Sequence, residues 1–265
     1  MSFKKILFVT IFNLLFLSVM GQEEIITARI EELYTNCDSY LGFDNQQNNY
    51  SIKNNVLSKK NTKQTYRYNN LSLGAITSVD FQNPLEIVVF YKNFNTVVLL
   101  DNQLNEIRKI DYNLHSSPIN IEAAALSSQN QIWIYDSISS KIGLHNTTTN
   151  SIKWISTMLE KGMVYYESDY THFYWIDTRF ILYRISIYGK IEKLGNIPNF
   201  DSIQLTKNNY CIYKIANQLY YYNLTTNISS KITINKKFVT NFFFRDGILS
   251  IFTQNEITNY KIILP

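Results

Sequence analysis

Paired carboxylates are the first chemistry to consider in this sequence. Glycoside hydrolysis needs two carboxyl groups across a cleft, one to donate a proton and one to act as nucleophile or base. Five acidic residues stand on or beside segments that we expect to form the inner strands of the fold: Asp80, Glu122, Glu167, Asp169 and Asp201. No motif links any two of them, and acidic residues at strand ends commonly close turns. A glycan hydrolase or lyase therefore stays an alternative function, and we predict no catalytic residue.

Metal binding and nucleophilic catalysis lack their usual patterns. Calcium loops carry acidic residues at alternate positions, whereas three aspartates of this chain each follow a predicted strand singly and fit Asx-turns: Asp101, Asp136 and Asp177. Zinc sites pair histidines at short spacing or place them beside cysteines. The three histidines do neither, so we interpret them as surface or loop residues: His115, His145 and His172. We predict neither a metal nor a cofactor.

The two cysteines, Cys37 and Cys211, leave two states open. In an exported protein a disulfide between them would tie the start of the chain to a late strand. Two isolated cysteines do not make a disulfide framework, and their spacing does not supply the geometry that a bridge requires. A bridge and two free thiols therefore both remain open.

Aromatic side chains are the most abundant candidates for binding, since the chain has 20 Tyr and 16 Phe. Several stand in clusters that could stack on sugars or form a protein-binding surface. We name four candidate binding residues from these clusters: Tyr166, Tyr174, Trp175 and Tyr221. Tyrosine and phenylalanine are also common in any strand, and neighbours along a strand point to opposite faces. Filling of the core is therefore the competing interpretation.

Short strand-like runs must position these residues. Runs rich in Ile, Val, Tyr, Phe and Trp recur from about Asp38 onward, separated by turn residues such as Asn, Asp, Ser, Lys and Gly. Examples are EIVVFY at Glu86–Tyr91, QIWIY at Gln131–Tyr135 and YCIY at Tyr210–Tyr213. No long amphipathic helical window lies between the runs, which argues against βαβ units and for antiparallel meanders.

The runs also repeat as groups, in which an apolar strand is followed by a turn, a second strand and usually a third. The starts of five copies are 45, 42, 37 and 38 residues apart: Ile87, Ile132, Tyr174, Cys211 and Leu249. A propeller blade takes about 40 to 50 residues, and another copy from Tyr40 raises the count to about six blades. We therefore predict an all-β fold, a β-propeller of about six blades; a β-sandwich or irregular packed sheets is the alternative.

The N-terminal residues indicate export. Lys4 and Lys5 precede the apolar run 6–17, and small or neutral residues then lead to the polar Gln22. This order is typical of a secretory signal peptide, which we assign to residues 1–21. The apolar run is shorter than the roughly 20 residues of a membrane-spanning helix, and an uncleaved anchor is the alternative.

The rest of the chain divides into a short segment and one domain. Residues 22–37 form an N-terminal lead-in segment, either a short helix or a strand, and residues 38–265 form a single propeller domain. Because the last copy stops at Pro265 with no spare strand, we expect the lead-in segment to complete the final blade and close the ring.

Composition and charge limit the classes of partner that the chain is expected to bind. The net charge is +4 and no block of Lys and Arg occurs, which indicates a mildly basic soluble surface rather than a phosphate-binding stripe. We predict no nucleic-acid partner. No second apolar stretch is long enough to cross a bilayer, so we predict no transmembrane segment in the mature chain.

Three stretches resemble a family of exported β-propeller-like proteins of flavobacteria and relatives. They are YLGFDNQQNNYSIKNNVLSKK from Tyr40, LGAITSVDFQNPLEIVVFYKNFNTVVLLDNQLNEI from Leu73 and NQIWIYDS from Asn130. The resemblance covers most of the chain and brings no catalytic residues. It implies a cell-envelope protein, periplasmic and associated with the outer membrane. Soluble propellers of such envelopes act as accessory subunits of outer-membrane machines, of which the plug subunit of the type 9 secretion translocon is one candidate.

We therefore expect a non-catalytic periplasmic scaffold that binds protein partners, as an accessory subunit of an outer-membrane secretion or assembly machine. The signs of export, the closed repeat architecture and the lack of a catalytic constellation favour this function. Repeat scaffolds offer a broad rigid face on which loops carry recognition. The alternative is a glycan-active hydrolase or lyase, or a carbohydrate-binding propeller.

Overall fold

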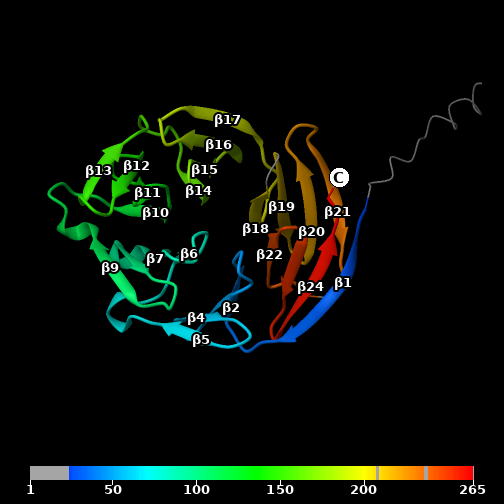
Figure 1. Ribbon diagram of the computed structural model, residues 1–265. Coiled ribbons are helices and arrows are strands. Elements are labelled where there is room, and N and C mark those ends of the chain that lie inside the picture. Colours follow the sequence, from blue (N-terminus) through cyan, green and yellow to red (C-terminus); the bar gives the residue numbers. More distant parts are fainter. Residues whose placement is uncertain (1–23, 207–208, 236–237, 265) are drawn as a thin grey trace, which may run out of the picture.

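A computed structural model describes residues 24–206, 209–235 and 238–264. In these ranges the chain forms 24 strands, which pair into four four-stranded sheets and one eight-stranded sheet that holds two further blades. The resulting six blades follow one another around a common axis (Figure 1). The predicted all-β propeller of about six blades is therefore confirmed. The predicted signal peptide, residues 1–21, lies outside the described residues.

The first three blades each take four consecutive strands, in order from the channel outward. Blade one contains β2 (Ser39–Phe43), β3 (Asn49–Lys53), β4 (Val56–Lys60) and β5 (Thr65–Tyr68). Blade two contains β6 (Ser78–Asp80), β7 (Ile87–Tyr91), β8 (Thr96–Leu100) and β9 (Glu106–Asp111). Blade three contains β10 (Ile121–Leu126), β11 (Gln131–Asp136), β12 (Lys141–Asn146) and β13 (Ser151–Trp154).

The last three blades follow the same order. Blade four contains β14 (Met163–Ser168), β15 (His172–Asp177), β16 (Ile181–Ser186) and β17 (Ile191–Asn196). Blade five contains β18 (Ser202–Thr206), β19 (Tyr210–Ile215), β20 (Gln218–Asn223) and β21 (Ile228–Thr233). Blade six contains β22 (Asn241–Arg245), β23 (Ile248–Phe252), β24 (Glu256–Ile262) and β1 (Ile25–Tyr34).

Helical structure among the described residues is confined to three 3₁₀ turns in loops. They are η1 (Leu71–Leu73), η2 (Lys92–Phe94) and η3 (Tyr112–Leu114). In this part of the chain no helix has the length and hydrophobicity needed to span a bilayer.

Middle strands are buried on both faces because each blade is covered by a neighbour on either side. All residues of β7 and β8 are buried, and their sequences, IVVFY and TVVLL, are continuous apolar runs. The outer strand of the same blade, β9, has the sequence EIRKID and leaves its first four residues exposed. The continuous apolar runs in the sequence therefore mark strands that lie between two sheets.

The beginning of the chain closes the sixth blade. β1 pairs antiparallel with β24 from Thr27 to its end. Its first two residues, Ile25 and Ile26, also pair in parallel with β21 of the fifth blade. The expectation that the lead-in segment completes the final blade is confirmed, and the segment forms a strand. The propeller therefore includes residues from Ile25 onward, and β1 lies at the outer edge of the ring (Figure 1).

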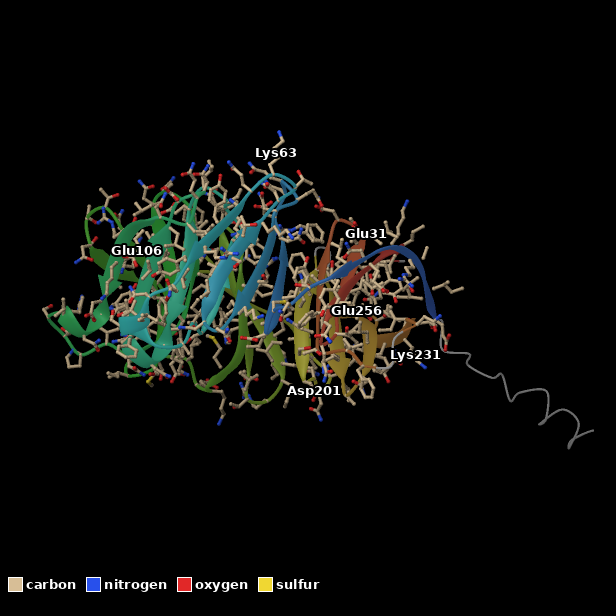
Figure 2. All side chains as sticks on the ribbon, turned by 90° about the horizontal axis from the view of Figure 1, so that it is seen from below. Glu31, Lys63, Glu106, Asp201, Lys231 and Glu256 are labelled. Carbon is tan, nitrogen blue, oxygen red and sulfur yellow. The ribbon has the colours of Figure 1, made fainter. Side chains whose placement is uncertain are left out.

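The inner strands all run in the same direction, which sorts the loops onto two faces. Side chains near the end of one inner strand bond the main chain near the end of the next, as Asp80 does with Leu126. We call the face on which the chain crosses from one blade into the next the apical face. The opposite face, which carries the loop after each inner strand, is the basal face. Asp201 and Lys63 mark these two faces on opposite sides of the molecule in Figure 2.

Apolar clusters fill the seams between neighbouring blades, and the closing seam is the exception. The seam between blades two and three holds 12 buried residues, Phe90 and Ile132 among them. Those between the other connected blades hold 8 to 11. The closing seam, between blades six and one, holds three: Tyr40, Phe252 and Ile257.

The two cysteines belong to different seams. Cys37 packs at the closing seam, and the buried Cys211 lies in the core between blades four and five. Both are free thiols, so of the two states that the sequence leaves open the structure has the unbridged one.

Candidate functional site

The acidic residues of the inner strands bind main-chain amides of the neighbouring blade. The Oδ2 atom of Asp80 on β6 accepts a hydrogen bond of 2.8 Å from the Leu126 amide on β10. The Oε1 atom of Glu167 on β14 accepts one of 3.1 Å from the Leu205 amide on β18. An inner strand has no strand partner on its channel side, so these side chains satisfy main-chain groups that would otherwise lack one.

Neutral side chains continue this ring of bonds. The Ser168 hydroxyl of blade four donates to the Leu126 carbonyl of blade three over 3.2 Å. Gln204 on β18 accepts from the amide of Phe244 on β22 over 2.7 Å and donates to its carbonyl over 2.8 Å. Side chains of the inner strands therefore join blades two to six in succession.

Blade six is joined to blade one in the same way. Asn241, at the start of β22, donates to the Tyr40 carbonyl on β2 over 3.1 Å. Arg245, at the end of β22, donates to the Phe43 carbonyl over 2.6 Å. The bonds at both ends of these strands show that β22 and β2 run in the same direction.

Enclosure changes the ionisation of the two channel carboxylates, which keep partial exposure to the channel. Burial raises the pKa of Glu167 to about 7, and the charge of Asp80 adds to this, while hydrogen bonds from Tyr165 and the Leu205 amide oppose it. Burial also raises the pKa of Asp80, against the hydrogen bonds of two backbone amides. Raised carboxyl pKa values are typical of catalytic acids. In this channel both groups bind main-chain amides, and we interpret them as structural links between blades.

The other three predicted acids lie apart from the channel pair. Glu122, near the apical end of β10, forms an ion pair of 3.6 Å with Lys92. Asp201 lies on the apical face and accepts a hydrogen bond of 2.6 Å from the Ala216 amide. Asp169 lies on the basal face. Glu122, Asp201 and Asp169 therefore bind a cation or main-chain amides of nearby loops.

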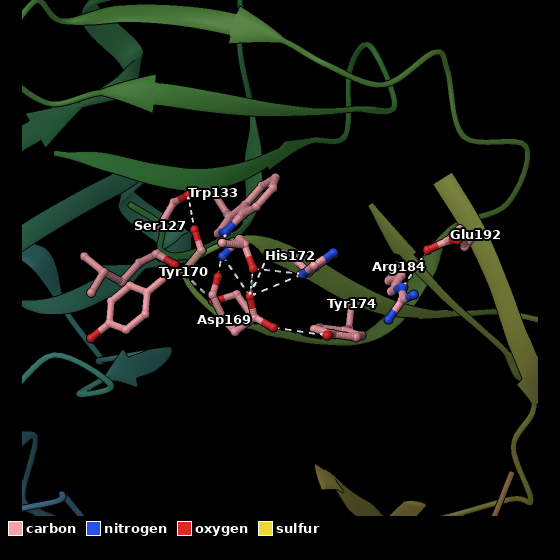
Figure 3. A network of polar contacts seen from close by, with 11 residues as sticks. Ser127, Trp133, Asp169, Tyr170, His172, Tyr174, Arg184 and Glu192 are labelled. Atoms are coloured by element: carbon pink, nitrogen blue, oxygen red, sulfur yellow. Dashed lines mark hydrogen bonds and ion pairs between the residues drawn. The ribbon is translucent and has the colours of Figure 1, made fainter. Parts of the chain in front are cut away.

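Asp169 organises the basal turn between β14 and β15 (Figure 3). Its Oδ1 atom accepts bonds of 2.7 Å from the Thr171 and His172 amides, and its Oδ2 atom accepts one of 3.1 Å from the Tyr174 hydroxyl. Burial opposes ionisation of Asp169, but these hydrogen bonds prevail and lower its pKa. The Asp169 carbonyl also accepts from Trp133 Nε1 of blade three over 3.1 Å. The turn therefore links two blades.

The four predicted aromatic residues do not form one site. Trp175 and Tyr221 are each 3% exposed and lie in the cores between blades. Tyr166 is on the inner strand of blade four, and its hydroxyl lies 3.0 Å from the Ser78 hydroxyl of blade two. Tyr174 caps the basal turn described above. Core filling therefore describes Trp175 and Tyr221, which offer no surface to a ligand.

The three aspartates that follow strands close turns, as the Asx-turn interpretation predicts. Each accepts hydrogen bonds from two amides of the residues that come after it: Asp101, Asp136 and Asp177. Asp177 is also paired with the Arg179 guanidinium at 2.8 Å. Within the described residues, no three His, Cys, Asp or Glu side chains gather as metal ligands.

One histidine corrects the surface interpretation. His145 is 2% exposed, because it stands on the middle strand β12. Its Nδ1 atom lies 2.8 Å from the Tyr112 hydroxyl and its Nε2 atom 3.0 Å from Asn150 Oδ1. Burial lowers the pKa of His145, and a neutral ring that accepts at one nitrogen and donates at the other satisfies both partners. The exposed His115 lies beside it in a cleft of about 390 Å³.

The apical face displays exposed apolar side chains in most of its loops. Four of them precede blades two, three, four and six, and two more stand in the turns between the middle strands of blades two and three. They are 45 to 89% exposed, and we call them the apical apolar residues: Leu71, Phe94, Leu114, Ile138, Met158 and Phe238. The basal loops expose three large apolar or aromatic side chains, two of which keep a hydroxyl group: Leu85, Tyr170 and Tyr188.

Asparagine side chains hold the apical loops in place. Asn55 donates to the Gly74 carbonyl and accepts from the Ile76 amide, the latter over 2.8 Å. Asn95 stands 40 residues later. It donates a hydrogen bond of 2.7 Å to the Ile119 carbonyl and accepts one of 2.8 Å from the Ile121 amide. Loops held in one geometry lose little conformational entropy when a partner binds.

The apical apolar residues were missed by the search for aromatic clusters, although the sequence contains a signal for them. Leu71, Leu114 and Met158 are 43 and 44 residues apart, close to the period of the strand repeat. Each stands in a polar, turn-rich stretch where a buried apolar residue is not expected. An apolar residue that recurs once per repeat within such loops indicates a shared exposed face.

These features define a six-bladed β-propeller that exposes apolar side chains in the loops of its apical face. No family model and no curated protein matches the chain. Virginiamycin B lyase from Staphylococcus aureus is similar in structure, with a TM-score of 0.58 and 13% identity over 90% of this chain and 94% of that one.

Two further propellers give similar values. BBS1N, solved in complex with ARL6, has a TM-score of 0.53 and 13% identity over 91% of this chain and 98% of that one. BamB from Moraxella catarrhalis has a TM-score of 0.51 and 11% identity over 89% and 99%. At these identities the similarity shows the fold alone, and function must come from the surfaces of this chain.

Proposed function

We propose that this chain is a non-catalytic, exported propeller that binds a protein partner through its apical face, as an accessory subunit of an outer-membrane secretion or assembly complex. The set of six apical apolar residues carries the proposal. Six exposed apolar side chains that share one face are a candidate interaction surface, and in interaction surfaces a few deeply buried side chains supply most of the binding energy. Periplasmic location rests on the N-terminal residues and on the family resemblance.

A protein partner suits this face better than a small molecule. The apolar side chains come from loops around the ring, so one ligand that covers several of them must be broad. The asparagine bonds at Asn55 and Asn95 hold two of these loops rigidly, which favours docking of a preformed surface. BBS1N, a similar propeller, has been solved with a protein partner.

The enzymatic alternative is a lyase or hydrolase acting in the channel, and the similarity to virginiamycin B lyase is the reason to retain it. Such a reaction needs an acid or base that is free to touch the substrate. Asp80 and Glu167, the acids of the inner strands, are bound to backbone amides of the next blade. We therefore place catalysis second.

The test is co-purification of the tagged protein from its own host after cross-linking of the cell envelope. Leu71→Ser, Leu114→Ser and Met158→Ser combined should reduce recovery of the partner about tenfold or more, since each removes an apolar contact from the interface. The matched control combines Leu85→Ser, Tyr170→Ser and Tyr188→Ser on the basal face and should recover the partner as the wild type does. Recovery of no outer-membrane component, or a loss confined to the basal variant, would contradict the proposal.

A further inference from the structure

A cleft of about 410 Å³ occupies the closing seam between blades six and one. Its volume lies in the range of about 300 to 1,000 Å³ that is usual for small-molecule sites. The apolar core of this seam contains only Tyr40, Phe252 and Ile257. The small apolar core of this seam leaves the cleft open.

The lining of the cleft combines polar and apolar side chains and is balanced in charge. Its amide and hydroxyl side chains come mainly from blade one: Gln47, Asn49, Ser51, Asn61, Thr62 and, from blade six, Asn259. One acid, Glu31, and one base, Lys60, are the charged residues of the lining. Groups that both donate and accept, with no net charge, suit a neutral ligand rich in hydroxyl groups.

Aromatic residues form part of the apolar lining of the cleft, together with Leu33, Ile248 and Ile257. Tyr34, the last residue of β1, lines it and is 82% exposed. The buried Tyr40 and Phe43 lie behind it on β2. An exposed ring beside amide groups is the combination that sugars require, because a pyranose has an apolar C–H face and a rim of hydroxyl groups.

Several polar groups of the lining are unused, while others are held in position. Among the described residues, the side chains of Gln47, Ser51 and Thr62 form no hydrogen bond. Asn49 is oriented by the Tyr40 hydroxyl, which donates to its Oδ1 atom over 2.9 Å. The site therefore combines an oriented amide with free donors and acceptors, as specific polar recognition needs.

We propose that the closing-seam cleft binds a neutral carbohydrate of about one or two sugar units, with Tyr34 stacking on the ring and Gln47, Asn49 and Ser51 bonding its hydroxyl groups. The balance of Glu31 and Lys60 disfavours a strongly charged ligand. None of the apical apolar residues lines this cleft, so the site is separate from the proposed protein-binding face.

The test is titration of the purified protein with neutral sugars by saturation-transfer NMR and calorimetry. The panel contains glucose, galactose, mannose, N-acetylglucosamine and the disaccharides cellobiose and chitobiose. At least one should bind with a dissociation constant of about 1 mM or below, which is about −4 kcal/mol. Tyr34→Ala should weaken binding about tenfold, whereas Tyr34→Phe should retain it. The matched control is Tyr188→Ala, since Tyr188 is 90% exposed on the basal face.

A second variant tests the cavity itself. Ser51→Leu should fill the cleft and abolish binding, with circular dichroism and the melting temperature as checks of folding. Tyr34→Ala, at an exposed position, decides the matter if Ser51→Leu does not fold. Absence of binding by every sugar up to about 10 mM, or unchanged binding by Tyr34→Ala, would overturn the proposal. The apical triple variant should bind sugar normally and Tyr34→Ala should retain the protein partner, so the two proposals can fail separately.

Discussion

The seam between blades two and three and the closing seam between blades six and one differ in the size of their apolar cores. The first is filled by 12 buried residues, including Phe90 and Ile132. The second has three, and hydrogen bonds from Asn241 and Arg245 to the main chain of blade one supplement them. A propeller can therefore be complete with one seam sparsely packed, and a cleft of about 410 Å³ lies at that seam.

Strand pairing and the chain connection hold the closing seam together in addition to its small core. β1 pairs with β24 in blade six and then continues directly into β2, the inner strand of blade one. Main-chain hydrogen bonds on one side and the covalent chain on the other thus hold the two blades together. The chain crosses from the outer strand of one blade to the inner strand of the next at the other seams as well, so with its small apolar core the closing seam relies more on hydrogen bonds.

Removal of residues 22–36, which include β1, should destabilise the closing seam more than any other change considered. Blade six would lose its outer strand, and the thin closing core could not hold the ring shut, so cooperative unfolding should be lost. Thermal melts by circular dichroism and size-exclusion chromatography measure this. A synthetic peptide of residues 22–36 should restore the transition. A truncated protein that melts cooperatively within a few degrees of the intact one would show that β1 is dispensable.

Two matched isoleucine variants compare the seams directly. Ile132→Ala removes a fully buried side chain from the filled seam and should cost about 4 kcal/mol of unfolding free energy, transfer and cavity terms together. Ile257→Ala, in the closing seam, should cost about 2 kcal/mol, because it lines an existing cleft and its removal leaves little new enclosed space. Urea denaturation measures both. Equal costs would mean that the closing seam is packed as tightly as the others.

The stability of the protein should depend on pH through Glu167, which joins blades four and five. Its folded pKa is about 7, above the value of an unfolded glutamate, so the folded state retains a proton that the unfolded state releases. The resulting stabilisation is full at low pH and is lost as the pH rises towards and through 7. The unfolding free energy of the wild type should therefore be about 2 to 3 kcal/mol larger at pH 5 than at pH 8 because of this group. Urea denaturation of wild type and Glu167→Gln at both pH values should show that difference in the wild type alone.

Glu192 supplies the control for this measurement. Lys190 and Arg184 hold the pKa of Glu192 at about 2, so it titrates outside the window from pH 5 to 8. Glu192→Gln should keep the pH dependence of the wild type within that window. A Glu167→Gln protein with an unchanged pH profile would assign the effect to another group.

The smallest effect concerns single hydrogen bonds between inner strands. Asn241→Ala removes the bond to the Tyr40 carbonyl at the closing seam and should cost about 1 kcal/mol of unfolding free energy. Ser168→Ala removes the corresponding bond to Leu126 between blades three and four and should cost about half as much, because apolar packing supports that seam. Chemical denaturation measures both, and the reverse order would contradict the dependence of the closing seam on polar bonds.

Local patterns predicted most of the strands, and one segment shows where they stop. The continuous apolar run of β7 has the length and composition of a buried strand, and turn residues bound it on both sides. The lead-in segment was compatible with a helix or a strand, because Ile26, Ile30 and Leu33 could share a helical face whereas Ile25 and Ala28 fit that face less well. Its partner β24 is more than 200 residues away, and pairing with that distant strand selects the extended form.

The candidate site depended still more on distant partners. Asp80 and Glu167 were predicted near inner strands and do lie there. Their partners, the amides of Leu126 and Leu205, belong to the next blade, about one repeat further along the chain. No local motif can contain such a pair, so the sequence could name the acids but could not distinguish a catalytic group from a structural one.

By itself the sequence determined the strands, the turns and the repeat, because these depend on residues within a few positions of one another. Only the tertiary structure decided which apolar residues remain exposed. Trp175 and Tyr221, two of the four predicted binding residues, are covered by neighbouring blades, whereas Leu71 and Leu114 are exposed. Apolar character alone does not distinguish the two pairs. Burial is set by the sheet that comes to lie on top, and that sheet is brought there by the closure of the ring.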